Sequence, residues 1–234
     1  MGQVFLLIEA PFAAFRPFQS GSYRSTTPVP SPTTVYGMLL NFAGIEQRSA
    51  TDQAITLIKD DLPSIEIAVG IPHLPDKPKA EIGILSQQLH HYPVGDSGKK
   101  ELATKTYGNK YWIAPVRREV IINLKLIVGV RAEEYLCNRI LSGLNGELED
   151  RRYGIPFAGD NNFLFDNIEL IDRPPCTRWY CQLDNGTYPE RRICRLTTWI
   201  NRADNTKTRI RVFYPTDFVI EPPESAWSKL PIGQ

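Results

Sequence analysis

The stretch YWIAPVRREVIINLKLIVGV, residues 111–130, constrains the fold most, because it predicts one long extended segment. Side chains two positions apart along a strand share a face, which gives this segment an apolar row: Ile122, Leu124, Leu126, Val128 and Val130. Pro115 has no N–H to donate to a β-ladder. We therefore expect the first part of the segment to lie at a sheet edge or to project from the sheet.

The other periodic segments predict the order of helices and strands. Further strands are expected at residues 4–10, 64–71, 81–92 and 161–172, and helices at 32–44 and 132–146. The order β-α-β-β-α-β is that of a ferredoxin-like (RRM-like) domain of the α+β class.

The first helix follows a Pro, Ser and Thr ramp in the stretch TTPVPSPTTVYGMLLNFAG. Ser31 can cap it, Pro32 suits its first position and Gly44 can end it. One apolar stripe is expected to be buried: Val35, Met38, Leu39 and Phe42.

Gly37 lies inside this helix, where Gly costs about 1 kcal/mol relative to Ala. Either the turn is tightly packed or another backbone must come close to it. The free N–H groups of the first turn, with the hydroxyls of Ser31, Thr33 and Thr34, would suit a phosphate. We therefore expect Ser31 to Gly37 to be a candidate phosphate contact while the apolar stripe stays buried.

Two features depart from a simple ferredoxin-like pattern. The middle hairpin, at about residues 86–120, is far longer than the 2–5 residues usual for a hairpin loop. A tail of about 60 residues follows the last strand of the unit. We expect a ferredoxin-like domain over residues 1–172 with the hairpin inserted as a thumb, and a β-rich C-terminal extension over 173–234 packed on it.

Charge is unevenly distributed, although the formal net charge of the whole chain is only +1. Residues 85–125 hold seven Lys and Arg against three Asp and Glu, with interleaved rings at His90, His91, Tyr92, Tyr107, Tyr111 and Trp112. Cations neutralise phosphates and flat rings stack on bases, the combination that a single-stranded nucleic acid needs. The alternative is a solvated hairpin whose rings pack on its own stem.

A second basic cluster lies at residues 191–211, with seven Lys and Arg against Asp204. Arg predominates there, and its planar fork suits bidentate phosphate binding. A nucleic-acid or protein contact is favoured over charge that merely protects strand edges.

Catalytic and metal chemistry receive little support. His90 and His91 are neighbours in a predicted strand and point to opposite faces, and His73 has no ligand spacing to either. We expect no metal, no cofactor, and four cysteines present as structural thiols. Metal-free RNA cleavage by a general base and acid remains the alternative, with His90 or His91, Tyr92 and Lys99 or Lys100 as candidates.

No signal peptide or membrane span is predicted, because Glu9 and Pro11 interrupt the apolar N-terminal run and no basic region precedes it. We expect a cytoplasmic protein that makes no membrane contact.

The motif PSPTTVYGMLLNFAG resembles the signature of the Cas-five subunits of CRISPR effector complexes, in the RAMP superfamily. The hairpin QLHHYPVG…GKKELA…PVRRE and the segment YGIPFAGDNNFLFDNIEL are similar to the DevS-type branch. The resemblance covers most of the chain up to about residue 170.

This resemblance implies a subunit of a type I Cascade that holds the 5′ handle of the crRNA, caps the backbone of Cas-seven subunits and contacts the Cas-eight-type large subunit near the target DNA. It implies a role in antiviral defence or guided transposition. DevS-type members usually work beside a separate nuclease, so no catalysis is expected. The alternative is an endoribonuclease that processes precursor crRNA through Tyr, Lys and His, for which Tyr36, His90 and His91 are candidates.

The residues expected to contact RNA lie in the helix entrance, the thumb and the segment after the second helix. They are Arg16, Tyr23, Arg24, Ser31, Thr33, Thr34, Tyr36, Gly37, His90, His91, Tyr92, Lys99, Lys100, Lys105, Lys110, Tyr111, Arg117, Arg118, Asn161 and Asn162.

Overall fold

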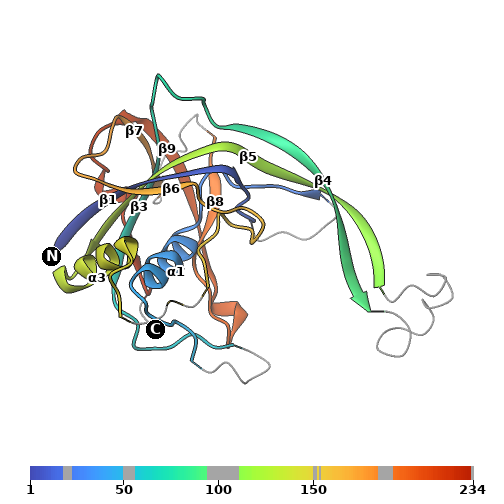
Figure 1. Cartoon of the computed structure of the whole chain (residues 1–234), viewed down its shortest axis with the longest axis horizontal. Helices are drawn as coiled ribbons and strands as arrows, with labels where there is room; N and C mark the ends of the chain where they lie inside the picture. Colours follow the sequence, from blue (N-terminus) through green and yellow to red (C-terminus); the bar gives the residue numbers. More distant parts are fainter. Residues whose placement is uncertain are drawn as a thin grey trace.

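The computed structural model describes residues 1–17, 23–49, 56–93, 111–149, 152, 154–183 and 192–232, with the backbone alone at 88–93 and 111–115. Figure 1 shows a large curved sheet with two helices beneath it and a long two-stranded arm. The helices are α1 (Pro32–Phe42) and α3 (Glu134–Asn145). The strands are β1 (Gly2–Ala13), β2 (Tyr23–Arg24), β3 (Ile65–Pro72), β4 (Glu81–Pro93), β5 (Tyr111–Ala132), β6 (Asn167–Ile171), β7 (Thr177–Gln182), β8 (Cys194–Trp199), β9 (Arg209–Val219) and β10 (Ser228–Leu230).

The strands form one sheet in the order β6-β1-β5-β3-β7-β9-β8. Every ladder along this path is antiparallel, so neighbouring strands run in opposite directions. The strands β7, β9 and β8 of the C-terminal tail continue the sheet beyond β3, and β10 also pairs with β3. The prediction of an α+β fold is confirmed.

Both helices cover one face of the sheet, where α1 contacts α3 and β3, and α3 contacts β1 and β5. The predicted apolar row of β5 turns towards them: Leu124, Leu126, Val128 and Val130 are buried, while Ile122 is half-buried. A Cβ added at Gly143 of α3 would lie 1.7 Å from the carbonyl oxygen of Phe42. Glycine is therefore required where α3 crosses the end of α1.

A smaller cluster covers the opposite face of the sheet. It comprises Phe5, Ala68, Ile127, Trp179, Cys181, Ala226 and Trp227. These residues alternate along their strands with those of the helix-facing core, as the pleat requires. Because side chains on both faces are buried, β1 and β3 are largely apolar, and so are residues 120–130 of β5 apart from Asn123 and Lys125.

The arm is formed by β4 and the first half of β5, which pair from Glu81 opposite Ile122 to Pro93 opposite Tyr111. It projects from the body of the protein, as Figure 1 shows, and Pro115 lies within it. The predicted projection is confirmed, but the hairpin begins at Glu81 rather than near residue 86. Residues 94–110, the tip of the predicted thumb, lie outside the described residues.

The start of α1 follows the predicted capping chemistry. Pro32 is the first helical residue, and the backbone N–H of Thr34 donates to the Ser31 hydroxyl at 3.3 Å. The helix ends at Phe42, and Gly44 follows with a φ of 68°. Of the predicted stripe, Val35, Leu39 and Phe42 are buried and Met38 is half-buried.

Candidate nucleic-acid interface

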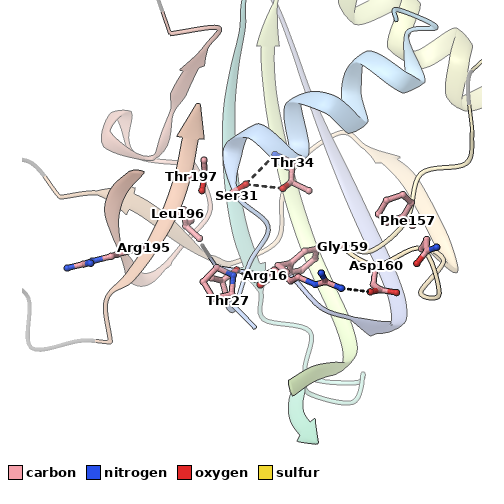
Figure 2. Close-up of a pocket in the computed structure, with 13 residues that line it drawn as sticks. Arg16, Thr27, Ser31, Thr34, Phe157, Gly159, Asp160, Arg195, Leu196 and Thr197 are labelled. Atoms are coloured by element: carbon pink, nitrogen blue, oxygen red, sulfur yellow. Dashed lines mark hydrogen bonds and ion pairs between the residues drawn. The ribbon is translucent and has the colours of Figure 1, made fainter. Parts of the chain in front are cut away.

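A polar cavity of about 570 Å³ opens at the N-terminus of α1. Four segments that are distant in sequence line it: the end of β1, the ramp before α1, the loop before β6, and β8. The lining residues are Phe15, Arg16, Pro17, Thr27, Ser31, Thr34, Phe157, Gly159, Asp160, Asn161, Arg195, Leu196 and Thr197. Figure 2 shows Ser31 and Thr34 at the helix entrance, between β8 with Arg195 and the loop with Asp160.

Hydroxyl groups form a short network at the helix entrance. The Ser31 hydroxyl lies 2.9 Å from that of Thr34 and 3.1 Å from that of Thr33. Thr33 also donates to the carbonyl oxygen of Thr197 at 2.8 Å, which ties α1 to β8. Ser31 and Thr34 therefore line the cavity, whereas Thr33 is committed to holding one of its walls.

Asp160 is the centre of the ionic network beside this cavity. One carboxylate oxygen accepts hydrogen bonds from Arg118 at 2.5 Å and from Arg16 at 3.2 Å. The other accepts from the backbone N–H and the side-chain amide of Asn162, at 3.1 and 2.8 Å. Burial alone would raise the pKa of Asp160, but the hydrogen bonds from Asn162 and Arg118 and the charge of Arg118 outweigh it and hold the pKa below its usual value of 3.8.

Arg24 adds a third guanidinium group to this region. Burial lowers the pKa of Arg24, and the positive charges of Arg16 and Arg118 lower it further, against a smaller opposing effect of Asp160. Three arginines therefore lie in this region, and two of them, Arg16 and Arg118, bind Asp160. The region carries an excess of positive charge, which favours an anionic ligand.

The loop that carries Asp160 is fixed against the end of β1. Gly159 has a φ of 79°, and a Cβ there would lie 2.3 Å from the carbonyl oxygen of Ala14. The N–H of Ala14 donates to the carbonyl oxygen of Ala158 at 3.0 Å. Only glycine fits this approach, so Gly159 serves to place Asp160 and Asn161 at the cavity.

Several residues predicted to bind RNA have internal roles instead. Tyr36 is 2% exposed, and its hydroxyl donates to the carbonyl oxygen of Pro63 at 2.8 Å. Arg118 is 1% exposed and pairs with Asp160. Asn162 orients Asp160. Tyr36 and Arg118 are therefore corrected from direct RNA contacts to core and supporting residues, whereas Asn162 is exposed and its RNA contact stays a prediction.

The other predicted residues of this region lie at or near the surface. Arg16 and Asn161 line the polar cavity. Tyr23 is 43% exposed, and its hydroxyl donates to Glu119 at 2.7 Å. Arg117 lies directly opposite Tyr23 in the β2–β5 ladder and is exposed.

Gly37 faces the side chain of Gln47, whose amide nitrogen would lie 3.2 Å from an added Cβ. Among the described residues, Gly37 is therefore packed against a side chain and is not approached by another backbone. Gly37 also lines a second, apolar cavity beside α1.

The predicted thumb residues fall largely beyond what the structure describes. Lys99, Lys100, Lys105 and Lys110 lie outside the described residues. The backbone of His90, His91, Tyr92 and Tyr111 belongs to the strands of the arm. Their RNA contacts stay predictions.

The second basic cluster lies on the hairpin of β8 and β9 and on the turn between them. Arg195 reaches the polar cavity described above. Arg202, Lys207 and Arg209 line a separate cavity of about 920 Å³, together with Lys59, Asp60 and Asp61. Arg191 lies outside the described residues.

Within the described ranges, no group of three or more His, Cys, Asp and Glu side chains is placed to hold a metal ion. The four cysteines are free thiols. No helix in this part of the chain has the length and apolar character needed to cross a membrane.

Three residues at the site escaped the sequence-based prediction. Asp160 is the centre of the ionic network, and Phe157 and Arg195 line the polar cavity. For Arg195 the basic cluster was a signal, and for Phe157 and Asp160 the signal was their place in the segment YGIPFAGDNNFLFDNIEL, which carries the family resemblance.

The fold and site define a class: an α+β protein with one large antiparallel sheet, a projecting hairpin and a cationic cavity at a helix N-terminus. Residues 4–145 match the model of the family described as CRISPR-associated protein (Cas_Cas5), and the chain belongs to this Cas-five family.

Solved structures share this fold. A chain of a "CRISPR RNA-guided surveillance complex" is 14% identical, with a TM-score of 0.56 and 96% of each chain covered. A second, "Crystal structure of Cas protein", is 12% identical with a TM-score of 0.53, covering 95% of this chain and 100% of its own. No curated protein matches the sequence.

Proposed function

We propose that this chain is a non-catalytic, DevS-type subunit of a type I Cascade that holds the repeat-derived 5′ handle of the guide RNA. The polar cavity at the N-terminus of α1 carries this proposal. Arg16 and Arg195 line this cavity together with the hydroxyls of Ser31 and Thr34. Guanidinium groups and a helix N-terminus are suited to a phosphate, so the cavity offers a place for the RNA backbone.

The charges around Asp160 support binding of an anion rather than a purely structural ion pair. Asp160 pairs with both Arg118 and Arg16, and the charges of these three residues also act on Arg24. The side chain of Arg16 is 53% exposed and its contact with Asp160 is long, at 3.2 Å. Arg16 can therefore turn towards a phosphate while Arg118 keeps Asp160 in place.

The arm formed by β4 and β5 acts in this proposal as the family's thumb. Its base lies beside the cavity, because Arg118 of β5 contacts Asp160. The thumb pins or displaces a base where the handle meets the spacer, with His90, His91, Tyr92 and Tyr111 and the lysines at 99, 100, 105 and 110 as RNA contacts. The subunit caps the Cas-seven backbone and contacts a Cas-eight-type subunit near the target DNA.

A ferredoxin-like core over residues 1–172 belongs to the same proposal. The sheet order β6-β1-β5-β3 supports it, since these strands and α1 and α3 follow the β-α-β-β-α-β order in the chain. The extension over residues 173–234 adds β7, β9 and β8 to the same sheet.

The environment of Tyr36 supports a non-catalytic role. Its hydroxyl is buried and donates to Pro63, and burial raises its pKa well above the usual range. A buried phenol held in this way cannot take a proton from a ribose hydroxyl. Incubation of the purified protein with repeat RNA in EDTA tests this. Specific cleavage that is lost in His90→Ala or His91→Ala would contradict the proposal.

RNA binding is tested by charge reversal at the cavity. Arg16→Glu and Arg195→Glu should each weaken binding of repeat-derived RNA and reduce the slope of log affinity against log salt by roughly 0.7 per lost phosphate contact. Arg173→Glu is the matched control, because Arg173 is exposed and lies outside the cavity. Equal slopes for all three variants and the parent protein would refute handle binding at this site.

A further inference from the structure

An apolar cavity of about 430 Å³ adjoins the polar one. It lies between α1 and the loop before β6, and Phe15, Thr34 and Phe157 line both cavities. Its other lining residues are Ile8, Pro30, Thr33, Val35, Gly37, Met38, Asn41, Gln47, Leu126, Gly154, Ile155, Pro156 and Phe165. Its volume falls within the usual range for small-ligand sites.

The lining defines what this cavity can accept. No charged side chain lines it among the described residues. Its polar lining side chains are the amides of Asn41 and Gln47 and the hydroxyls of Thr33 and Thr34. A phosphate would lose its hydration without gaining a cation there, so a neutral group is required. Ile155 and Phe157 line the cavity and are 73% and 46% exposed. Exposed apolar groups around a cavity indicate that a partner covers them.

We propose that this apolar cavity holds one unstacked base of the guide RNA while the phosphate of the same or the next nucleotide lies in the polar cavity. The inference rests on the proposed handle binding. A nucleotide joins a flat neutral ring to an anion through a short sugar link, and the paired cavities offer the matching chemistry side by side. Phe157, in the wall shared by both cavities, supplies the ring on which the base stacks.

Gly37 takes on a specific role in this arrangement. It lines the apolar cavity in the second turn of α1, where it faces Gln47. A larger residue at this position would occupy space that the base needs. Gly37 therefore combines tight packing against Gln47 with a place in the cavity wall, and no other backbone approaches it among the described residues.

The test compares two RNA probes of equal charge: an oligoadenylate of about ten nucleotides and a ribose-phosphate strand of the same length without bases. Phe157→Ala should weaken binding of oligoadenylate about 5- to 140-fold, and leave binding of the base-free strand within about twofold of the parent value. Phe157→Trp should bind oligoadenylate about as well as the parent protein does, because it keeps an aromatic ring at this position. Phe218→Ala is the matched control, because Phe218 is similarly exposed, at 41%, on β9 and lines neither cavity.

Two further variants separate the two cavities. Gly37→Leu should also weaken oligoadenylate alone, whereas Arg195→Ala should weaken both probes by the same factor. If Phe157→Ala and Gly37→Leu alter both probes alike, or neither, the base site is refuted while binding at the polar cavity stands. If the parent protein binds neither probe, handle binding fails and the base site with it.

Discussion

The ion pair of Asp160 with Arg118 makes a quantitative prediction about stability. Their side chains are 7% and 2% exposed. Asp160 has further donors in Arg16 and in Asn162, whereas Arg118 has no other hydrogen-bond partner in the described part of the chain, where its Nε and Nη2 atoms are buried and unsatisfied. Asp160→Asn would therefore leave a buried guanidinium without its counter-charge.

The expected cost follows from this burial. Removing one partner of a buried pair costs about 3–5 kcal/mol, so Asp160→Asn should lower the free energy of unfolding by about that amount. Arg118→Met should cost less, because Asp160 would keep its bonds to Arg16 and Asn162. Arg16→Ala should cost about 1 kcal/mol or less, because Arg16 is half exposed.

Urea denaturation at neutral pH measures these differences, provided that the slope of the transition is the same for each variant. The pH dependence supplies a second check. Because the folded-state pKa of Asp160 is lowered, its stabilising effect is complete above the unfolded value of 3.8 and is lost as the pH falls through the folded value. The gap between the parent protein and Asp160→Asn should therefore close in acid. A gap near zero at neutral pH, or one that is unchanged in acid, would refute the reasoning.

Two other predictions concern glycine and cysteine. Gly159→Ala should lower the thermal unfolding midpoint clearly more than Gly154→Ala. Both glycines have a positive φ, but only a Cβ at Gly159 would meet the carbonyl oxygen of Ala14. Equal shifts of the midpoint would contradict the role of this close approach. Burial raises the pKa of Cys194 to about 12, so at pH 8 the native protein should react with a thiol reagent at the exposed Cys176 and not at Cys194. Modification of Cys194 before unfolding, detected by mass spectrometry, would show that this thiol is not protected.

Local chemistry predicted the features that depend on neighbours in sequence. The Ser31 hydroxyl caps α1 and Pro32 opens it, because capping needs only the residues of one turn. The apolar row of β5 was equally readable, since two-residue alternation requires no knowledge of the partner strand. The arm was placed correctly but its start was not. Ile82 and Ile84 of β4 alternate like core residues, yet they are 58% and 64% exposed.

The candidate site was harder to predict because its contacts join distant positions. Asp160 meets Arg118 and Arg16 across separations of 42 and 144 residues. The prediction for Tyr36 was wrong for a different reason. Tyr36 lies one position beyond Val35 on a helix whose buried face is wider than a single stripe. Its ring packs edge-on against Trp199 of β8. No periodicity within α1 indicates that a strand from the tail covers that side.

The C-terminal extension therefore belongs to the site as much as the first part of the chain does. Arg195 and Thr197 of β8 line the polar cavity, and Thr197 accepts the hydrogen bond that ties β8 to Thr33. The sheet order explains why β8 can reach the helix entrance: β3, β7, β9 and β8 lie in sequence across the sheet, whose curve carries β8 back to α1, as Figure 1 shows. A chain ending at residue 172 would lose one wall of the cavity and the acceptor that fixes Thr33. For this reason the two parts of the chain form a single RNA-binding surface in the proposed function.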